Sequence, residues 1–249
     1  MDFSLTDEQQ ALLEVATQFS RARLAPRYRA REQAGVIERE IVAELGQMGF
    51  LGAELPESVG GLGLDCVTSG LLLEQIAYGD YNVSYVNLLA SLCGQIIADH
   101  ARSDEARDWL RQIVRGEKTV AIALTESSVG SDAARLKLKA TRLADGWRLN
   151  GEKASISMAT QADVAVVFAR TGSTEDRAHG ISAFLVPLDA PGISRHAFDD
   201  IGTGTEGGVG SRREALSKAI FPPCLRGARG RGAFGHDDEC GLVRLPQPR

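Results

Sequence analysis

The 249-residue sequence contains few cysteines, few aromatic residues and no long apolar run. Its four cysteines, Cys66, Cys93, Cys224 and Cys240, are not spaced as zinc ligands or as a redox pair, so we expect free thiols in a reducing cytoplasm. The most apolar stretch, Tyr85–Ala98, is too short to span a bilayer. The net charge of -5 disfavours a nucleic-acid partner, because phosphate binding needs a basic face. With no secretory leader recognisable at Met1, we expect a soluble cytoplasmic protein without membrane insertion.

Apolar residues recur with a helical period as far as about residue 116, which predicts an all-helical domain over residues 1–116. Thr6 and Gln9 have the form of a capping box, and Pro26 should end the helix that follows. Further helices are expected around Ile41–Met48, at Cys66–Tyr78, at Val83–His100 and from Ser103 to Gly116.

From Lys118 the period changes to two, which predicts a β-domain over residues 117–201. Short strands joined by turns, with no helices between them, are typical of an antiparallel sandwich or barrel. The fold class is therefore α+β, a helical domain followed by a β-domain. Strands are expected at Val120–Leu124, Leu136–Thr141, Trp147–Asn150, Val164–Ala169, Ile181–Val186 and Ile193–Phe198.

Residues 202–249 form a glycine- and arginine-rich tail, which we expect to be disordered because it offers little apolar surface to bury. It holds eight Lys and Arg against five Asp and Glu, so the remainder of the chain is acidic. Only Glu214–Phe221 could form a short helix. The abrupt change of composition suggests a gene read out of frame, and this is our preferred hypothesis over an evolved basic tail.

The segment Leu124–Asp132 follows an expected strand and carries small and hydroxyl residues, which let backbone N–H groups approach a ligand closely. It resembles the signature of the acyl-CoA dehydrogenase family, Thr-Glu-Pro, two small residues and Gly-Ser-Asp. A second segment, Leu149–Ser157, resembles the family's Asn-Gly-x-Lys-x-Trp-Ile-Thr. Pro56–Gly63 and Gly180–Pro187 resemble two further family segments, so the likeness covers about Phe3 to Gly202 in the family's order.

The resemblance implies FAD as cofactor and acyl-CoA as substrate. It places the cofactor contacts at Leu124, Thr125, Ser131, Ser155 and Ser157, with Ser131 also contacting the substrate. It also implies an electron-transfer flavoprotein or a similar acceptor as partner, and a homotetramer for the full-length form.

Two departures from the family pattern bear on the pocket. Ser155 stands where the family has an aromatic residue, so no aromatic side chain packs against the flavin at this position. The smaller side chain leaves more space in the pocket, and we hypothesise that a bulkier or cyclic acyl group occupies it. Ser157 replaces the family's Thr and keeps the hydroxyl. Taken without the resemblance, Ser155 and Ser157 could equally be the solvent face of a strand, and Glu126 and Asp132 could simply satisfy local N–H groups.

The family's reaction is α,β-dehydrogenation of an acyl thioester, in which a carboxylate removes the α-proton and flavin N5 accepts a hydride. The resemblance places that base in a C-terminal helical domain which this chain lacks. We therefore expect no catalytic residue, no metal site and an inactive fragment.

The sequence leaves two alternatives open. One is a flavin monooxygenase of the same fold, which the missing aromatic residue allows. The other is a non-catalytic fragment that binds acyl-CoA or a partner through an exposed apolar face.

Overall fold

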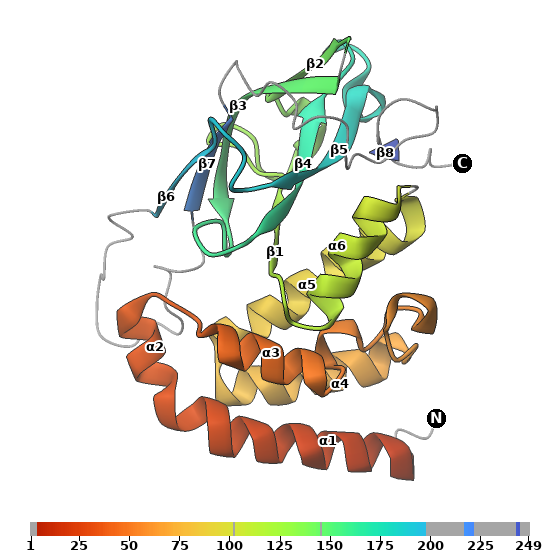
Figure 1. The fold of residues 1–249 in the computed structure, drawn as a ribbon, viewed down its shortest axis with the longest axis vertical. Coiled ribbons are helices and arrows are strands. Elements are labelled where there is room, and N and C mark those ends of the chain that lie inside the picture. The colour runs from red at the N-terminus through yellow and green to blue at the C-terminus, as the bar shows by residue number, and fades with distance from the viewer. Residues whose placement is uncertain (1–3, 102, 145, 198–216, 222–242, 245–249) are drawn as a thin grey trace.

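The computed structural model describes the chain except residues 1–3, 102, 145, 198–216, 222–242 and 245–249. Figure 1 shows a helical domain at one end of the molecule and a β-domain at the other. The helices are α1 (Asp7–Phe19), α2 (Tyr28–Ala34), α3 (Arg39–Gln47), α4 (Cys66–Gly79), α5 (Tyr81–His100) and α6 (Asp104–Val114). The strands are β1 (Val120–Ala123), β2 (Lys139–Leu143), β3 (Gly146–Ile156), β4 (Val164–Arg170), β5 (Ile181–Pro187), β6 (Ser194–Ala197), β7 (Ser217–Phe221) and β8 (Val243–Arg244).

Four of the six described α-helices begin where a side chain accepts from their first N–H groups, whereas α2 and α3 have no side-chain cap. Thr6 and Gln9 form the expected capping box of α1. Asp65, Asp80 and Ser103 cap α4, α5 and α6. After Phe19 the chain continues as a short π-helix and then a 3₁₀ turn that contains Pro26. The helical period of the sequence is thus confirmed at each predicted helix.

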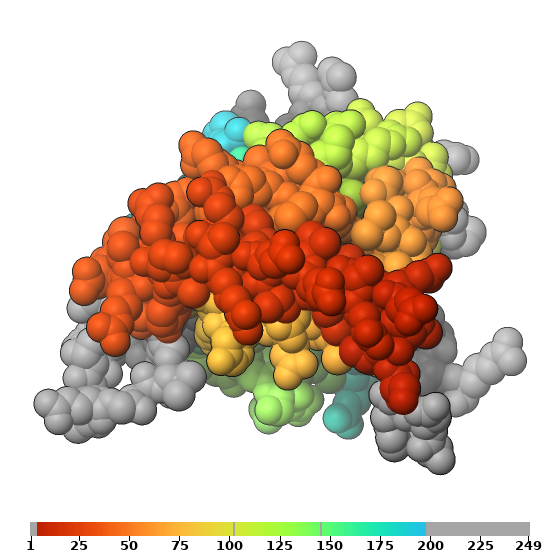
Figure 2. All heavy atoms as spheres, turned by 90° about the horizontal axis from the view of Figure 1, so that it is seen from below, coloured from red at the N-terminus to blue at the C-terminus, as the bar shows by residue number. Residues whose placement is uncertain are grey.

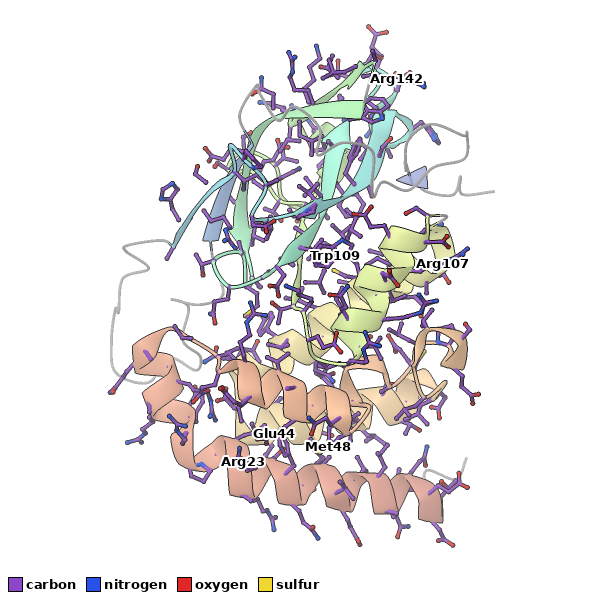
Figure 3. All side chains as sticks on the ribbon, viewed as in Figure 1. Arg23, Glu44, Met48, Arg107, Trp109 and Arg142 are labelled. Carbon is purple, nitrogen blue, oxygen red and sulfur yellow. The ribbon has the colours of Figure 1, made fainter. Side chains whose placement is uncertain are left out.

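The helices form a bundle in which α5 is central, with α4 on one side and α6 on the other. Figure 2, which views the molecule from the helical end, shows α1 lying across the outer face. Arg23 and Glu44 pair where the continuation of α1 passes α3 (Figure 3). Gly116 ends the domain with a φ of +71°, and a Cβ there would lie 2.2 Å from the Val42 carbonyl oxygen, so a side chain would separate α3 from this turn.

The β-domain is one mixed sheet in the order β6-β7-β3-β2-β4-β5-β8, with β1 beside β4. The expected antiparallel pairing is present in β2–β3, β3–β7, β4–β5, β5–β8 and β6–β7. β1 pairs with β4 in parallel, and so does β2 at one position. β1 also contacts α5, where the Cys93 thiol lies 3.7 Å from the Ala121 carbonyl oxygen.

Two local expectations are corrected. Leu136–Leu138 alternates in burial as a strand would, yet the strand begins only at Lys139, because the N–H groups of Lys137 and Leu138 bond to the Glu126 carboxylate instead. Ser217–Phe221 is a strand, not the end of a short helix, because its backbone pairs with β3 and β6.

Apart from β7 and β8, the tail from residue 202 lies outside the described residues. Among the helices that are described, none has the length and apolar character needed to cross a membrane.

Candidate functional site: the junction of β1 and β3

The structure brings together two of the segments singled out in the sequence. The chain leaves β1 through Leu124 and Thr125, and β3 ends at Ile156. The backbone N–H of Ala154 donates to the Thr125 carbonyl oxygen at 3.0 Å. Leu124 and Thr125 therefore lie beside Ser155 and Ser157. Ser131 lies further along the loop, and within the described part of the chain no hydrogen bond joins it to the two serines.

A buried ion pair holds this junction. Lys153 is fully buried on β3, and its Nζ lies 3.0 Å from Glu126 Oε1 and 2.8 Å from the Leu124 carbonyl oxygen. Glu126 is also buried and accepts the N–H groups of Lys137 and Leu138, each at 2.8 Å. One carboxylate and one ammonium thus fasten β3, the end of β1 and the start of β2 to each other.

Burial alone raises the pKa of Glu126, but hydrogen bonds from the Leu138 N–H, from Lys153 and from the Lys137 N–H outweigh it, so the pKa is lowered overall. Burial lowers the pKa of Lys153, and the hydrogen bond and charge of Glu126 offset only part of this effect. A buried charge must be paired and hydrogen-bonded to be tolerated. Glu126 therefore does more than satisfy N–H groups in its own turn, because its carboxylate accepts hydrogen bonds from residues eleven and twelve positions further along the chain.

The loop that carries Ser131 is open to solvent. Glu126 and Val129 exchange two backbone hydrogen bonds, of 2.9 and 3.0 Å, which close a tight turn. Beyond this turn Gly130, Ser131 and Asp132 are exposed. A Cβ placed on Gly130 would meet no atom within 4 Å. This part of the loop therefore has open space beside its backbone.

The end of β3 is irregular, so Ser155 and Ser157 do not alternate along a strand. Ser155 has a φ of +56° and Met158 a φ of +64°, a region that residues other than glycine rarely adopt. The pairing with β7 shifts register between Lys153 and Ile156, which marks a bulge. Ser155 is exposed, and Ser157 is half-buried in the following turn. Such backbone strain is concentrated at ligand sites in other proteins.

The open positions fit a flavin cofactor. In the part of the chain that is described, the hydroxyls of Thr125, Ser131, Ser155 and Ser157 have no hydrogen-bond partner. They are exposed or half-buried, so they can donate to a polar heterocycle or a pyrophosphate. The carbonyl of Leu124 is already bonded to Lys153. Leu124 could therefore contact a ligand only through its side chain or the surface of its backbone.

Sequence reasoning missed Lys153 as an organising residue, although the pattern carried a signal. Leu149 and Lys153 have the same parity on β3, and Leu149 is buried. Period-two alternation therefore places Lys153 on the inner face, where its charge requires a carboxylate.

The architecture matches that of solved acyl-CoA dehydrogenases. Butyryl-CoA dehydrogenase from Megasphaera elsdenii is similar with a TM-score of 0.77 and 32% identity, over 90% of this chain and 57% of that one. Glutaryl-CoA dehydrogenase from Mycobacterium smegmatis, solved in complex with FADH2, is similar with a TM-score of 0.76 and 25% identity, over 88% of this chain and 53% of that one. The fold is therefore that of an acyl-CoA dehydrogenase.

Sequence comparisons agree. The family model of the N-terminal acyl-CoA dehydrogenase domain matches residues 6–117, and that of the middle domain matches residues 121–211. Benzylmalonyl-CoA dehydrogenase of Aromatoleum aromaticum is 36% identical over 78% of this chain and 51% of its own length. The Caffeyl-CoA reductase-Etf complex subunit CarC of Acetobacterium woodii is 34% identical over 66% of this chain and 43% of its own. The chain belongs to the acyl-CoA dehydrogenase family, and it spans about half the length of the curated relatives that it matches.

Proposed function

We propose that this chain forms the FAD- and acyl-CoA-facing part of an acyl-CoA dehydrogenase, which removes hydrogen from the α- and β-carbons of an acyl thioester. The observation that carries the proposal is the junction of β1 and β3, where an ion pair aligns two segments whose hydroxyls have no partner among the described residues. When bound, FAD would accept the hydride that leaves the β-carbon.

The chain's own residues would bind and orient. Thr125 and Ser157 would hold the flavin by their hydroxyls and neighbouring backbone, with Leu124 shaping the same edge. Ser131, on the open loop, would contact both FAD and acyl-CoA. Lys153 and Glu126 would hold the two segments at a fixed spacing, which preorganises the site before a ligand arrives.

Ser155 would leave space where larger side chains narrow the pocket. We propose a bulky or cyclic acyl group for this space, which the similarity to a benzylmalonyl-CoA dehydrogenase supports. Faster flavin reduction by straight-chain than by cyclic acyl-CoA, in a full-length enzyme containing this domain, would contradict that choice.

We assign the catalytic base to none of the described residues and place it in a C-terminal helical domain outside this chain. We propose domains at residues 1–116 and 117–201, with residues 202–249 as a tail. Taken alone, the chain would then bind ligands without turnover.

The full-length form would act in the cytoplasm as a homotetramer with an electron-transfer flavoprotein, and the similarity to a subunit of an Etf complex supports this partner. The comparisons favour neither a monooxygenase nor a mere binding fragment.

The test is titration of the full chain with FAD, followed by flavin fluorescence. We expect saturable binding by the wild-type chain and weaker binding by Ser157→Ala, because each lost hydrogen bond costs about 1 kcal/mol. Thr141→Ala, which removes an exposed hydroxyl on β2, is the matched control and should bind as the wild type does.

Absence of FAD binding by the wild-type chain would refute the assignment of the site in this chain. Equal loss of affinity in Ser157→Ala and Thr141→Ala would refute the role of Ser157. Anaerobic addition of acyl-CoA should leave the bound flavin oxidised, and rapid bleaching of its visible absorbance would show that a base lies within this chain.

A further inference from the structure

The turn that follows β3 has two sets of polar anchors, and one of them comes from the helical domain. We call residues Ser157–Ala162 the site turn, because it begins at a proposed flavin contact. Internally it is closed by the N–H groups of Gln161 and Ala162, which donate to the Met158 carbonyl oxygen at 3.0 and 2.7 Å. With Met158 at a φ of +64°, this backbone requires outside contacts to keep its shape.

The first anchor is the Gln161 side chain. Its Oε1 accepts the backbone N–H of Ile37 at 2.9 Å, and its Nε2 lies 3.3 Å from the Gly35 carbonyl oxygen. Gly35 ends α2 with a φ of +66°, which turns the chain toward the β-domain. We call residues Gly35–Arg39, between α2 and the start of α3, the strut.

Arg39 provides the second link between the strut and the site turn. Its Nη2 donates to the Gln161 carbonyl oxygen at 2.9 Å, and its Nη1 lies 2.6 Å from Asp163 Oδ2. Asp163 also accepts the N–H of Thr119 at 2.8 Å, at the point where the chain crosses into β1. The strut is thus tied both to the turn and to the first strand of the β-domain.

On the other side, Arg195 of β6 donates from Nη1 to the carbonyl oxygens of Ala159 and Ala162, at 3.2 and 2.9 Å. Between the strut, the site turn and Trp109 of α6 lies a cavity of about 410 Å³. Figure 3 shows Trp109 where α6 faces the sheet. Ile37 of the strut and Met158, Ala159 and Ala162 of the site turn are buried in the core, so the polar links act together with apolar packing, and they are the contacts that orient the backbone of the turn beside this open space.

We propose that Gln161 and Arg39 are positioning residues for flavin binding, because the strut sets the conformation of the site turn and hence the place of Ser157. The effect on flavin binding rests on the proposed function. That the strut holds the conformation of the site turn rests on these contacts alone. It assigns a role in the β-domain's ligand site to a segment of the helical domain that is remote from it in sequence.

The decisive variant is Gln161→Met, which keeps side-chain length but removes both side-chain bonds, to Ile37 and to Gly35, and leaves the Arg39 bond to the backbone carbonyl of residue 161 in place. In the full chain without ligand, we expect amide hydrogen exchange across residues 155–163 to accelerate about tenfold, as two lost hydrogen bonds would allow. FAD should bind about tenfold more weakly, and the visible spectrum of the bound flavin should shift. Gln161→Glu, which keeps the acceptor for Ile37, should restore part of the protection.

The matched control is Gln95→Met on α5, since Gln95 makes one exposed hydrogen bond with Asp99. The urea midpoint of Gln161→Met should fall no more than that of this control.

Unchanged amide exchange in residues 155–163 would overturn the claim that the strut holds the site turn. Faster exchange with unchanged FAD affinity and spectrum would overturn the positioning role. If the wild-type chain binds no FAD, the proposed function is overturned. The hydrogen-exchange data then test by themselves whether the strut holds the site turn. If Gln161→Met does not fold, Arg39→Lys replaces it, because a lysine cannot reproduce the fork of bonds to Gln161 and Asp163.

Discussion

Among the described residues, each of the two domains has a buried ion pair, and the two pairs share the same pattern of hydrogen bonds. In the helical domain Arg31 Nε lies 2.6 Å from Asp80 Oδ2, and both residues are almost fully buried. In the β-domain Lys153 Nζ lies 3.0 Å from Glu126 Oε1. In both pairs the cation also donates to a backbone carbonyl oxygen, and the carboxylate also accepts two backbone N–H groups.

The two pairs differ in what their carboxylates hold. Asp80 accepts the N–H groups of Asn82 and Val83, which belong to the first turn of α5, so it caps the central helix. Glu126 accepts N–H groups of residues 137 and 138, which follow the open loop. The same chemistry therefore supports a helix core in one domain and the spacing of the proposed ligand site in the other. Removing the first pair should chiefly unfold the protein, and removing the second should chiefly impair binding.

The largest expected effect comes from Asp80→Ala. It leaves the buried Arg31 with Glu38, 3.7 Å away, as its remaining charged partner and removes the cap of α5, so we expect the free energy of unfolding to fall by about 3–5 kcal/mol. Urea denaturation followed by far-ultraviolet circular dichroism measures it. Ser103→Ala, which removes only the cap of α6, should cost about 1 kcal/mol. Equal losses in the two variants would show that the Arg31–Asp80 pair adds nothing to its cap.

Lys153→Met is the matching change in the β-domain. Glu126 keeps its two backbone donors, so we expect a loss near the lower end for a broken buried pair, about 3 kcal/mol. FAD affinity should fall further than the stability loss explains, because Leu124 loses its link to β3. The measurement is FAD titration without urea, at a temperature at which the variant is fully folded. Unchanged affinity would mean that the pair is purely structural.

A smaller effect should appear as a pH dependence. Hydrogen bonds outweigh burial and lower the pKa of Glu126, so its ionised form stabilises the folded chain. That stability is present above the ordinary carboxyl pKa of about 4.3 and is lost as pH falls through the lowered value. The difference in unfolding free energy between wild type and Glu126→Gln should therefore shrink on acidification below about pH 4. A difference that stays constant across this range would contradict the lowered pKa.

The starts of α1 and α6 could be predicted because their signals are local, whereas α2 was not predicted and α1 ends at Phe19, before Pro26. Thr6 with Gln9, and the acidic first turn after Ser103, mark caps that any helix at these positions would need. The buried strands β4 and β5 were equally visible, as continuous β-branched and apolar runs bounded by Asp163 and Pro187.

The rest depended on partners distant in sequence. The continuous apolar run of β1 shows that the strand is buried, but not that β4 will lie beside it in parallel. Alternation in Leu136–Leu138 predicted a strand, and the Glu126 carboxylate bonds to the N–H groups of Lys137 and Leu138 instead. The positive φ of Ser155 carried no signal, since the residue is not glycine. The family likeness supplied the proposed site residues, whereas the ion pair that joins their two segments emerged only from the fold.

The smallest expected effect comes from an ion pair that lacks what both buried pairs share. Arg111 Nη1 lies 2.9 Å from Asp108 Oδ1 on α6, with both side chains largely in solvent and neither held by a backbone group of another element. Water and salt screen such a pair, so Arg111→Ala should change the free energy of unfolding by less than about 0.5 kcal/mol. Urea denaturation at low and high salt measures it. A loss approaching that of Lys153→Met would mean that distance alone governs these pairs, and that the backbone amides bound by Asp80 and Glu126 are incidental to their strength.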